Sequence, residues 1–209
     1  MHDNAKDDRD DTAEPLIIDF QSPGRFDVHN PLSDQPAPTS WQAASARLGE
    51  DAGVQHFTSP EQVRAHALAF FQQAQRNLCL YSPDLEPWLF HHSSIQQACT
   101  RFLLAHPRNR LRILIEDSTR AVQSGHRLLA LARRLSSNAQ IRKVNPEYPR
   151  EEDAYLIADK TGLLIRPHRD PHNGYALYNN PARVRLSQSS FDRAWERSLS
   201  DANLRSFLL

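Results

Sequence analysis

One strand-turn-strand pattern in the second half of the chain constrains its fold more than any other feature. The segment Glu151–Pro167 reads EEDAYLIADKTGLLIRP and contains two short apolar runs, Ala154–Ala158 and Gly162–Ile165. The residues Asp159–Gly162 separate the two runs, and Asp and Gly favour tight reversals of the chain. The pattern therefore predicts a buried β-hairpin.

Apolar periodicity on both sides of this hairpin indicates alternating strands and helices. Thr58-Ser59-Pro60 supplies cap residues followed by proline at a first helical position. Alternation of strands and helices, followed by further strands, predicts an α/β fold: a three-layer α/β/α sandwich with a mixed sheet. The predicted strands are 78–81, 111–115, 141–144 and 175–178, and the predicted helices are 61–76, 93–105, 121–135 and 181–198, with a loose helix at 42–55.

Charge divides the chain into an acidic first part and a basic remainder. Residues 1–41 hold nine acidic and three basic side chains, and residues 42–209 hold 16 acidic and 22 basic, so net charges of −6 and +6 sum to zero. The acidic part is also rich in proline, which is typical of linkers. We expect residues 1–55 to be a disordered tail and linker, and residues 56–209 to be one folded domain. The role of the apolar island Leu16–Phe20 inside the tail stays open.

The hairpin resembles the one that carries the catalytic motif HxKxxxxD in phospholipase D-like domains. When Asp159 takes the motif's aspartate, Glu152 and Ala154 fall on its histidine and lysine. The G-S-x-N segment that follows in that family falls on Arg166–Arg169. The resemblance implies a phospholipase D-like fold with a degenerate active site. Such enzymes are usually built from two facing halves, and this chain has length for a single half.

Three further segments resemble an uncharacterised proteobacterial domain that is expected to share this fold. They are LYSPDLEPWLF from Leu80, GHRLLALARRLSS from Gly125 and FDRAWERS from Phe191. In some proteins that domain follows an acetyltransferase domain, but nothing in the first 55 residues here resembles an acetyl-CoA loop. The resemblance covers residues 56–209 and implies no activity.

Three basic side chains gather where the hairpin ends. Arg166, His168 and Arg169 offer potential donors within four residues, which is enough to hold a phosphate or a carboxylate. The simpler interpretation, which we favour, is a solvated basic loop at a strand end.

Asp117 and His126 form a second candidate site. Asp117 follows a predicted strand, and His126 precedes a predicted helix, so both belong to the end of the sheet where ligands bind in open α/β folds. The imidazole is suited to act as a base, a ligand or a donor. Alternatively, His126 anchors the loop to Glu116 or Asp117.

The sequence gives no sign of a cofactor or a metal. It has no G-x-G-x-x-G, no Walker loop and no G-x-S-x-G. His91 and His92 are adjacent and point apart, and prolines beside His168 and His172 disfavour the helix that would align that pair. Cys79 and Cys99 lack metal-ligand spacing, and we expect both to be core residues.

Several features bear on location and partners. The polar start of the chain is the reverse of a signal peptide, and no apolar run approaches the ~20 residues that span a bilayer. We therefore expect a cytoplasmic protein without membrane contact. Only three of the 25 basic residues are lysine, which genomic composition explains more simply than anion binding. A homodimer through the sheet face and an anionic ligand stay open.

These observations favour a non-catalytic binding or regulatory module with a single phospholipase D-like half. One rival is a hydrolase or transferase that uses His126 with Asp117 as an acid–base pair. The other is a weak nucleic-acid-binding protein in which the acidic tail competes for the basic body.

Overall fold

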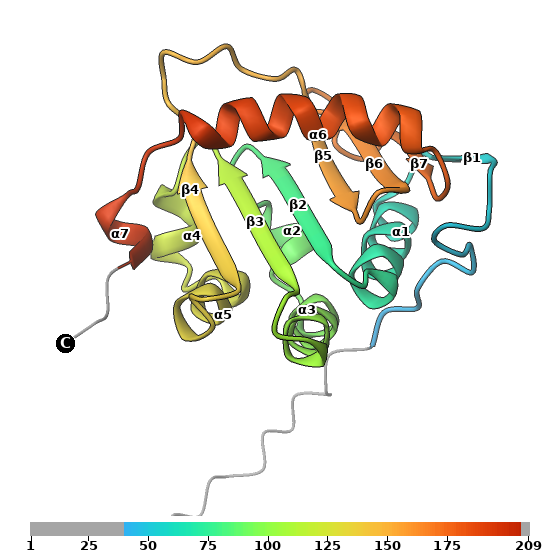
Figure 1. Cartoon of the computed structure of the whole chain (residues 1–209), viewed down its shortest axis with the longest axis horizontal. Coiled ribbons are helices and arrows are strands. Elements are labelled where there is room, and N and C mark those ends of the chain that lie inside the picture. Colours follow the sequence, from blue (N-terminus) through green and yellow to red (C-terminus); the bar gives the residue numbers. More distant parts are fainter. Residues whose placement is uncertain (1–39, 206–209) are drawn as a thin grey trace, which may run out of the picture. The chain divides into compact units, whose positions relative to one another are not determined.

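The protein is built around one mixed sheet of seven strands (Figure 1). The structure, a computed structural model, describes residues 40–205. Within them the strand order is β1-β7-β6-β5-β2-β3-β4, in which β2, β3 and β4 are parallel and all other neighbours are antiparallel. The strands are β1 (Val54–Phe57), β2 (Asn77–Ser82), β3 (Arg110–Ile115), β4 (Ala139–Lys143), β5 (Asp153–Ala158), β6 (Gly162–Pro167) and β7 (Gly174–Leu177).

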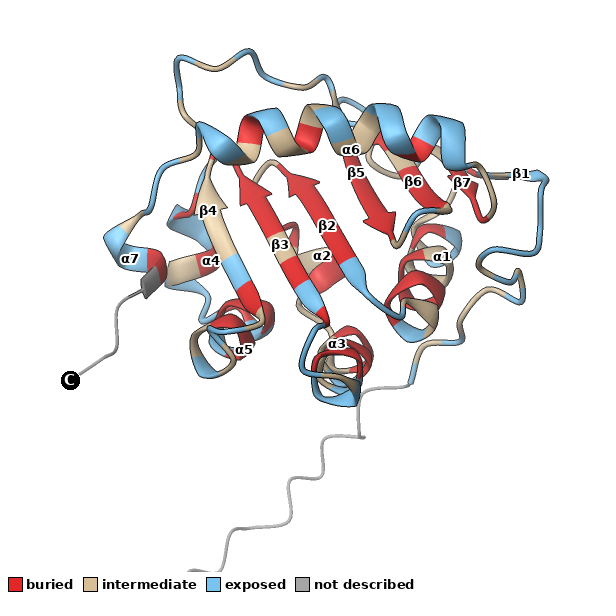
Figure 2. Cartoon of the chain, in the orientation of Figure 1, coloured by how far each residue is buried: buried red, intermediate tan, exposed pale blue. Residues whose placement is uncertain are grey.

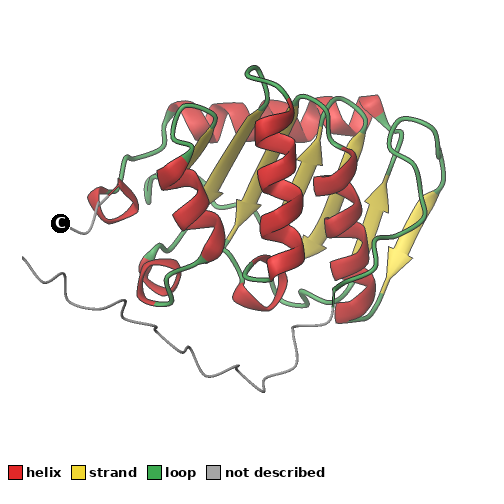
Figure 3. Cartoon of the chain, turned by 90° about the horizontal axis from the view of Figure 1, so that it is seen from below, coloured by secondary structure: helices red, strands yellow, loops and turns green. Residues whose placement is uncertain are grey.

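Helices cover both faces of the sheet, which confirms the predicted α/β sandwich. Figure 3 shows α1 (Pro60–Gln73), α3 (Ser93–Ala105) and α5 (Arg127–Arg134) side by side on one face. On the other face α6 (Pro181–Glu196) crosses the strands (Figure 1). Three short helices complete the described chain: α2 (Pro87–Phe90), α4 (Thr119–Gln123) and α7 (Ala202–Arg205). None of the described helices is both long enough and apolar enough to cross a membrane.

Each face of the sheet has its own apolar core. Leu156 and Leu164 point to the face under α1, α3 and α5, while Tyr155 and Ile157 point to the face under α6. Neighbouring residues of a strand point to opposite faces, and both faces are covered here. The central strands are therefore buried along most of their length (Figure 2), as their continuous apolar sequences require.

The predicted hairpin is confirmed as β5 and β6. Its register runs from Asp153 opposite Pro167 to Ala158 opposite Gly162. Asp159 opens the turn at a φ of 55°, a conformation that Asp adopts more readily than most residues. Its carboxylate accepts hydrogen bonds from the backbone N–H groups of residues 75, 76 and 77, at 2.8, 2.7 and 2.9 Å. The turn is thereby tied to the segment that enters β2.

The predicted loose helix at 42–55 is wrong. These residues form an irregular strap followed by β1, which the sequence did not reveal. The strap's backbone bonds outward: the N–H of Leu48 donates to the Gln73 side chain at 2.7 Å, and that of Gly49 to the Tyr178 carbonyl at 2.8 Å. Alanines of the strap pack on the core, so their spacing serves contact with the body rather than a helix. The expected tail over residues 1–39 lies outside the described residues.

Two predicted helix boundaries also need correction. The helix expected at 121–135 is split into α4 and α5, because Gly125 adopts a φ of 58° and His126 starts a new helix. The cap of α3 is His92, whose side chain accepts from the N–H of Ser94, rather than Ser93 or Ser94. In both places an imidazole replaces the more usual hydroxyl or carboxylate cap.

The tie between Asp159 and the start of β2 makes a testable prediction. We expect Asp159→Asn to lower the free energy of unfolding by about 1–3 kcal/mol, because the amide keeps the turn but one N–H loses its charged acceptor. Urea denaturation measures the change. Lys160→Gln, at the exposed neighbouring position, is the control and should shift stability by less than about 0.5 kcal/mol. Equal effects of the two variants would contradict the anchoring role.

Candidate functional site

The candidate site lies at the edge of the sheet where β2, β3 and β6 end and β5 begins. These ends meet because β5 runs antiparallel to β2 and to β6. Loops at the carboxyl ends of parallel strands form the ligand crevice in open α/β sheets. The loops after β2, β3 and β6 contribute Glu86, Glu116 and His168 to this edge.

Its centre is a buried ion pair between Arg166 of β6 and Glu86 of the loop after β2. The guanidinium and the carboxylate meet through two hydrogen bonds: Nη1 to Oε1 at 2.6 Å, and Nη2 to Oε2. Arg166 is 1% exposed and Glu86 is 8% exposed. The Ser82 hydroxyl donates to Glu86 Oε2 at 3.0 Å. The carboxylate is therefore fixed from two sides.

Local backbone geometry aims Glu86 at this partner. Leu85 and Glu86 have φ values of 65° and 24°, which are unusual for residues other than glycine. The Asp84 carboxylate accepts from the N–H of Glu86 at 2.9 Å and helps to hold the bend. The loop after β2 thus adopts an unfavourable conformation that brings a carboxylate into the protein interior.

Aromatic rings complete the enclosure of Arg166. Its guanidinium carbon lies 5.6 Å from the ring centre of Trp88 and 6.0 Å from that of Phe90. Arg64 lies over the rings of Trp88 and Trp41, at 5.8 and 5.2 Å. The interpretation of the basic segment as a solvated loop is therefore wrong for Arg166, because a bidentate carboxylate and two rings replace its water.

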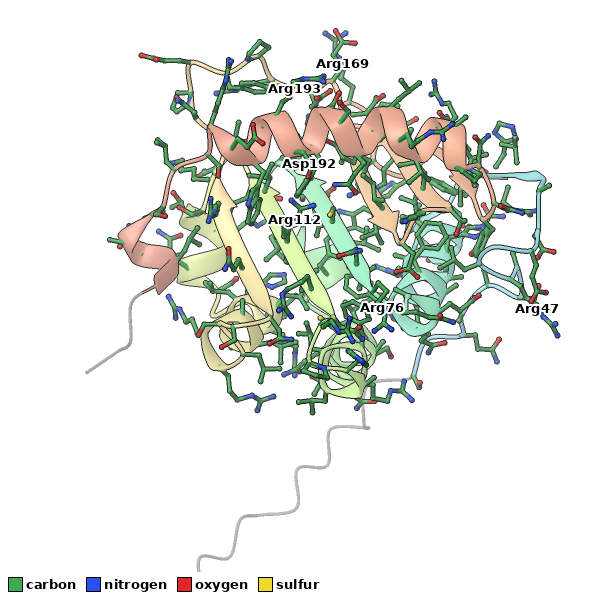
Figure 4. All side chains as sticks on the ribbon, viewed as in Figure 1. Arg47, Arg76, Arg112, Arg169, Asp192 and Arg193 are labelled. Carbon is green, nitrogen blue, oxygen red and sulfur yellow. The ribbon has the colours of Figure 1, made fainter. Side chains whose placement is uncertain are left out.

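The other two residues of that segment lie elsewhere. Arg169 is exposed and projects from a loop away from the body (Figure 4). The His168 ring stacks on Tyr81 at 6.3 Å between centres, and its Nδ1 lies 4.0 Å from Glu116 Oε1. The three predicted donors thus do not converge on one point.

Tyr81 organises a second polar cluster that the sequence did not reveal. Its hydroxyl donates to Glu116 Oε1 at 3.2 Å and accepts the N–H of Glu151 at 3.3 Å. Tyr155 stacks on Tyr81 with ring centres 5.4 Å apart. Burial raises the pKa of both tyrosines and of Glu151, so the two hydroxyls stay protonated at neutral pH. Both tyrosines stand in apolar strand sequences, where they are indistinguishable from core residues.

Two buried atoms of this cluster have no hydrogen-bond partner among the described residues. They are the hydroxyl oxygen of Tyr155 and Nε2 of His168. Buried polar atoms are normally satisfied, so this cluster is the least saturated part of the carboxyl edge.

Asp117 and His126 do not form the predicted pair. Asp117 is exposed, and its carboxylate accepts from the N–H and the hydroxyl of Thr119 at 3.0 and 2.7 Å. His126 is fully buried and caps α5 by accepting the Leu128 N–H at 3.2 Å. No hydrogen bond joins the two side chains in the described structure, and the ring that contacts His126 belongs to His91, 4.9 Å away.

The positions of the degenerate motif lie at both ends of β5. Glu152 is exposed just before the strand, and Ala154 is fully buried directly opposite Arg166. Asp159 stands at the far end of the strand, in the turn described above. Across residues 40–205, no group of three or more His, Cys, Asp or Glu side chains is arranged to hold a metal ion.

Residues 59–207 match a family described as Domain of unknown function (DUF7931). The chain belongs to this family. No curated protein matches the chain. The family assignment covers most of the chain and carries no activity with it.

Solved structures place the fold. Nuc from Salmonella typhimurium, a phospholipase D family member, is 18% identical with a TM-score of 0.51, covering 70% of this chain and 96% of Nuc. TrmBL2, an archaeal chromatin protein described with a novel mode of DNA binding, is 12% identical with a TM-score of 0.52. The match covers 71% of this chain and 54% of TrmBL2, so this chain spans about half of that protein. These likenesses establish a phospholipase D-like fold and nothing further.

The buried ion pair makes a testable prediction about stability. We expect Arg166→Met to lower the free energy of unfolding by about 3–5 kcal/mol, because Glu86 is then left buried without its partner. Adding Glu86→Gln should restore part of this loss, so that the double variant is more stable than the sum of the single changes implies. Urea denaturation of the four proteins measures the coupling. Arg169→Met, at an exposed arginine, is the control, and a similar loss there would contradict the enclosed pair.

His126 makes a prediction about acid stability. Burial, with a smaller effect of His91, lowers the pKa of His126 to about 4 from the usual 6.5, and its Nε2 lies near the Leu85 backbone without an ordinary hydrogen bond. The unfolded state therefore takes up this proton first as the pH falls. The stabilising contribution is full above about pH 6.5 and is lost between that pH and about 4, by roughly 3 kcal/mol.

Denaturation of His126→Asn across this pH range tests the prediction, since Asn caps helices well and does not titrate there. The variant should lose less stability on acidification than the wild type does. His56→Asn, at an exposed histidine, is the control. Parallel pH profiles for His126→Asn and the wild type would show that His126 does not titrate as stated.

Proposed function

We propose that this chain is a non-catalytic binding or regulatory module of phospholipase D-like fold. The observation that carries the proposal is the arrangement around Ala154. At the position where the family's motif has lysine, a buried methyl group stands opposite Arg166. The nearest strong cation is thus Arg166, and both of its terminal nitrogens bind Glu86.

Charge explains why this arrangement disfavours phosphodiester cleavage. A phosphate needs a cation that is free to neutralise it. An incoming phosphate would have to displace Glu86 from a desolvated bidentate pair, or lie against a carboxylate that repels it. At the motif's histidine position the chain has Glu152, which is a further negative charge.

His168 is the imidazole that an active enzyme would need at this edge. Its Nδ1 is 4.0 Å from Glu116, but its Nε2 is buried, where a nucleophile would need access to substrate. The rival pair His126 and Asp117 has no observation in its favour, because His126 is enclosed and the two side chains are not joined by a hydrogen bond. The homodimer that the sequence left open stays a prediction.

A phosphodiesterase assay tests the proposal. Bis(p-nitrophenyl) phosphate and supercoiled plasmid serve as probes, with and without divalent cations, against a heat-inactivated control. We expect no turnover above the control. His168→Ala and His172→Ala are compared so that any activity is assigned: His172 packs on Trp88, away from the Glu116 contact.

Turnover that His168→Ala abolishes and His172→Ala leaves intact, with both variants folded, would overturn the proposal. It would establish an enzyme in which the imidazole has moved from β5 to the end of β6.

A further inference from the structure

The opposite edge of the sheet carries an uncovered, basic region. α6 begins near the turn after β5, where the N–H of Asn180 donates to the Thr161 carbonyl at 3.0 Å. It ends near β4, where Trp195 lies under the Arg142 guanidinium at 4.5 Å. The helix therefore crosses the face diagonally, and the amino-terminal halves of β2, β3 and β4 stay uncovered by described elements (Figure 1).

The side chains on this uncovered face are polar and cationic. Alternation along the strands puts Arg110 and Arg112 on the same face as the buried Leu114, and the register puts Gln140 and Arg142 beside them. Asn77 at the start of β2 stands opposite Arg110. The amino ends of these strands are exposed (Figure 2). A sheet face under a helix is normally apolar, so this composition is unusual.

Two hollows lie along this region. The larger, about 930 Å³, lies between the flank of α6 and the strands, and the smaller, about 350 Å³, lies at the amino ends of β2 and β3. They adjoin, because Asn77 and Arg112 line both. The cations that line them are Arg110, Arg112, Lys160, Arg185 and Arg193.

Few carboxylates compensate these cations. Asp192 binds Arg112 at 2.8 Å, and Figure 4 shows the two facing each other between helix and sheet. Asp159 spends its oxygens on three backbone N–H groups. Glu196 completes the acidic lining. Within the described chain, Arg110, Lys160 and Arg185 have no carboxylate partner within ion-pair distance.

We propose that this groove, at the edge opposite the candidate site, binds the phosphodiester backbone of a nucleic acid. Its cations are spread along α6, whose 16 residues span about 24 Å, and do not converge on one point. A linear polymer of closely spaced charges matches this distribution better than a single phosphate. Guanidinium forks pair with phosphate oxygens, and the larger hollow also borders the start of α6, where the helix dipole favours anions.

The lining also defines the mode of binding. No aromatic side chain lines either hollow, so the groove lacks a platform for stacking bases. Contacts to the backbone position a nucleic acid without reading its sequence. Binding is therefore sequence-independent and weakens steeply with salt.

Fluorescence anisotropy on the full chain tests the groove. The probes are a labelled 20-nucleotide single strand and the matching duplex, titrated between 50 and 200 mM salt, with polyglutamate as a competitor without phosphate. The variant is Lys160→Glu with Arg185→Glu. Its matched control is Arg101→Glu with Arg134→Glu, which makes the same change of net charge at exposed arginines of α3 and α5, on the other face.

We expect the groove variant to lower the association constant about tenfold and to reduce the salt slope by about 2, with the control within about threefold of wild type. Circular dichroism verifies that both variants are folded. The proposal is overturned by equal losses in both variants, by no binding of the wild type at 50 mM salt, or by polyglutamate competing as well as nucleic acid. None of these results bears on whether the carboxyl edge is catalytic.

Discussion

The desolvation of Arg166 is the constraint on which the carboxyl edge of this protein depends. A guanidinium inside a protein needs a partner that satisfies both its charge and its donors. Glu86 does so, and the loop after β2 adopts two positive φ values to deliver it. The pair links the central hairpin to α2 and to the rings around it. An edge that otherwise would offer a cation to ligands is thereby closed.

The two edges of the sheet treat arginine in opposite ways. At the carboxyl edge a single arginine is buried and neutralised. At the amino edge several arginines stand on an uncovered sheet face, with fewer carboxylates than cations around them. The same sheet therefore separates a saturated interior site from an open electropositive groove. The difference follows from the path of α6, which covers the carboxyl halves of β3 and β4 and leaves their amino halves bare.

Local patterns were enough to predict most of the sheet. The hairpin, β2, β3, β4 and β7 are marked by apolar runs bounded by turn residues, and these runs are long enough to identify strands. The strap at 42–55 and β1 escaped, because an alanine-rich segment bonded to distant residues has no periodicity of its own. The break at Gly125 escaped for a related reason: a glycine inside an apolar pattern is compatible with both one helix and two.

The sequence alone determined that an α/β domain is present, that its hairpin keeps the spacing of a phospholipase D-like motif, and that Glu152 and Ala154 occupy the positions of its histidine and lysine. Only the tertiary structure decided what Arg166 does. Eighty residues separate it from Glu86. No local signal distinguishes an arginine that will be enclosed from one that will be solvated, because burial depends on which distant loop arrives above it. The same holds for the groove, whose cations come from strands and a helix that meet only after folding.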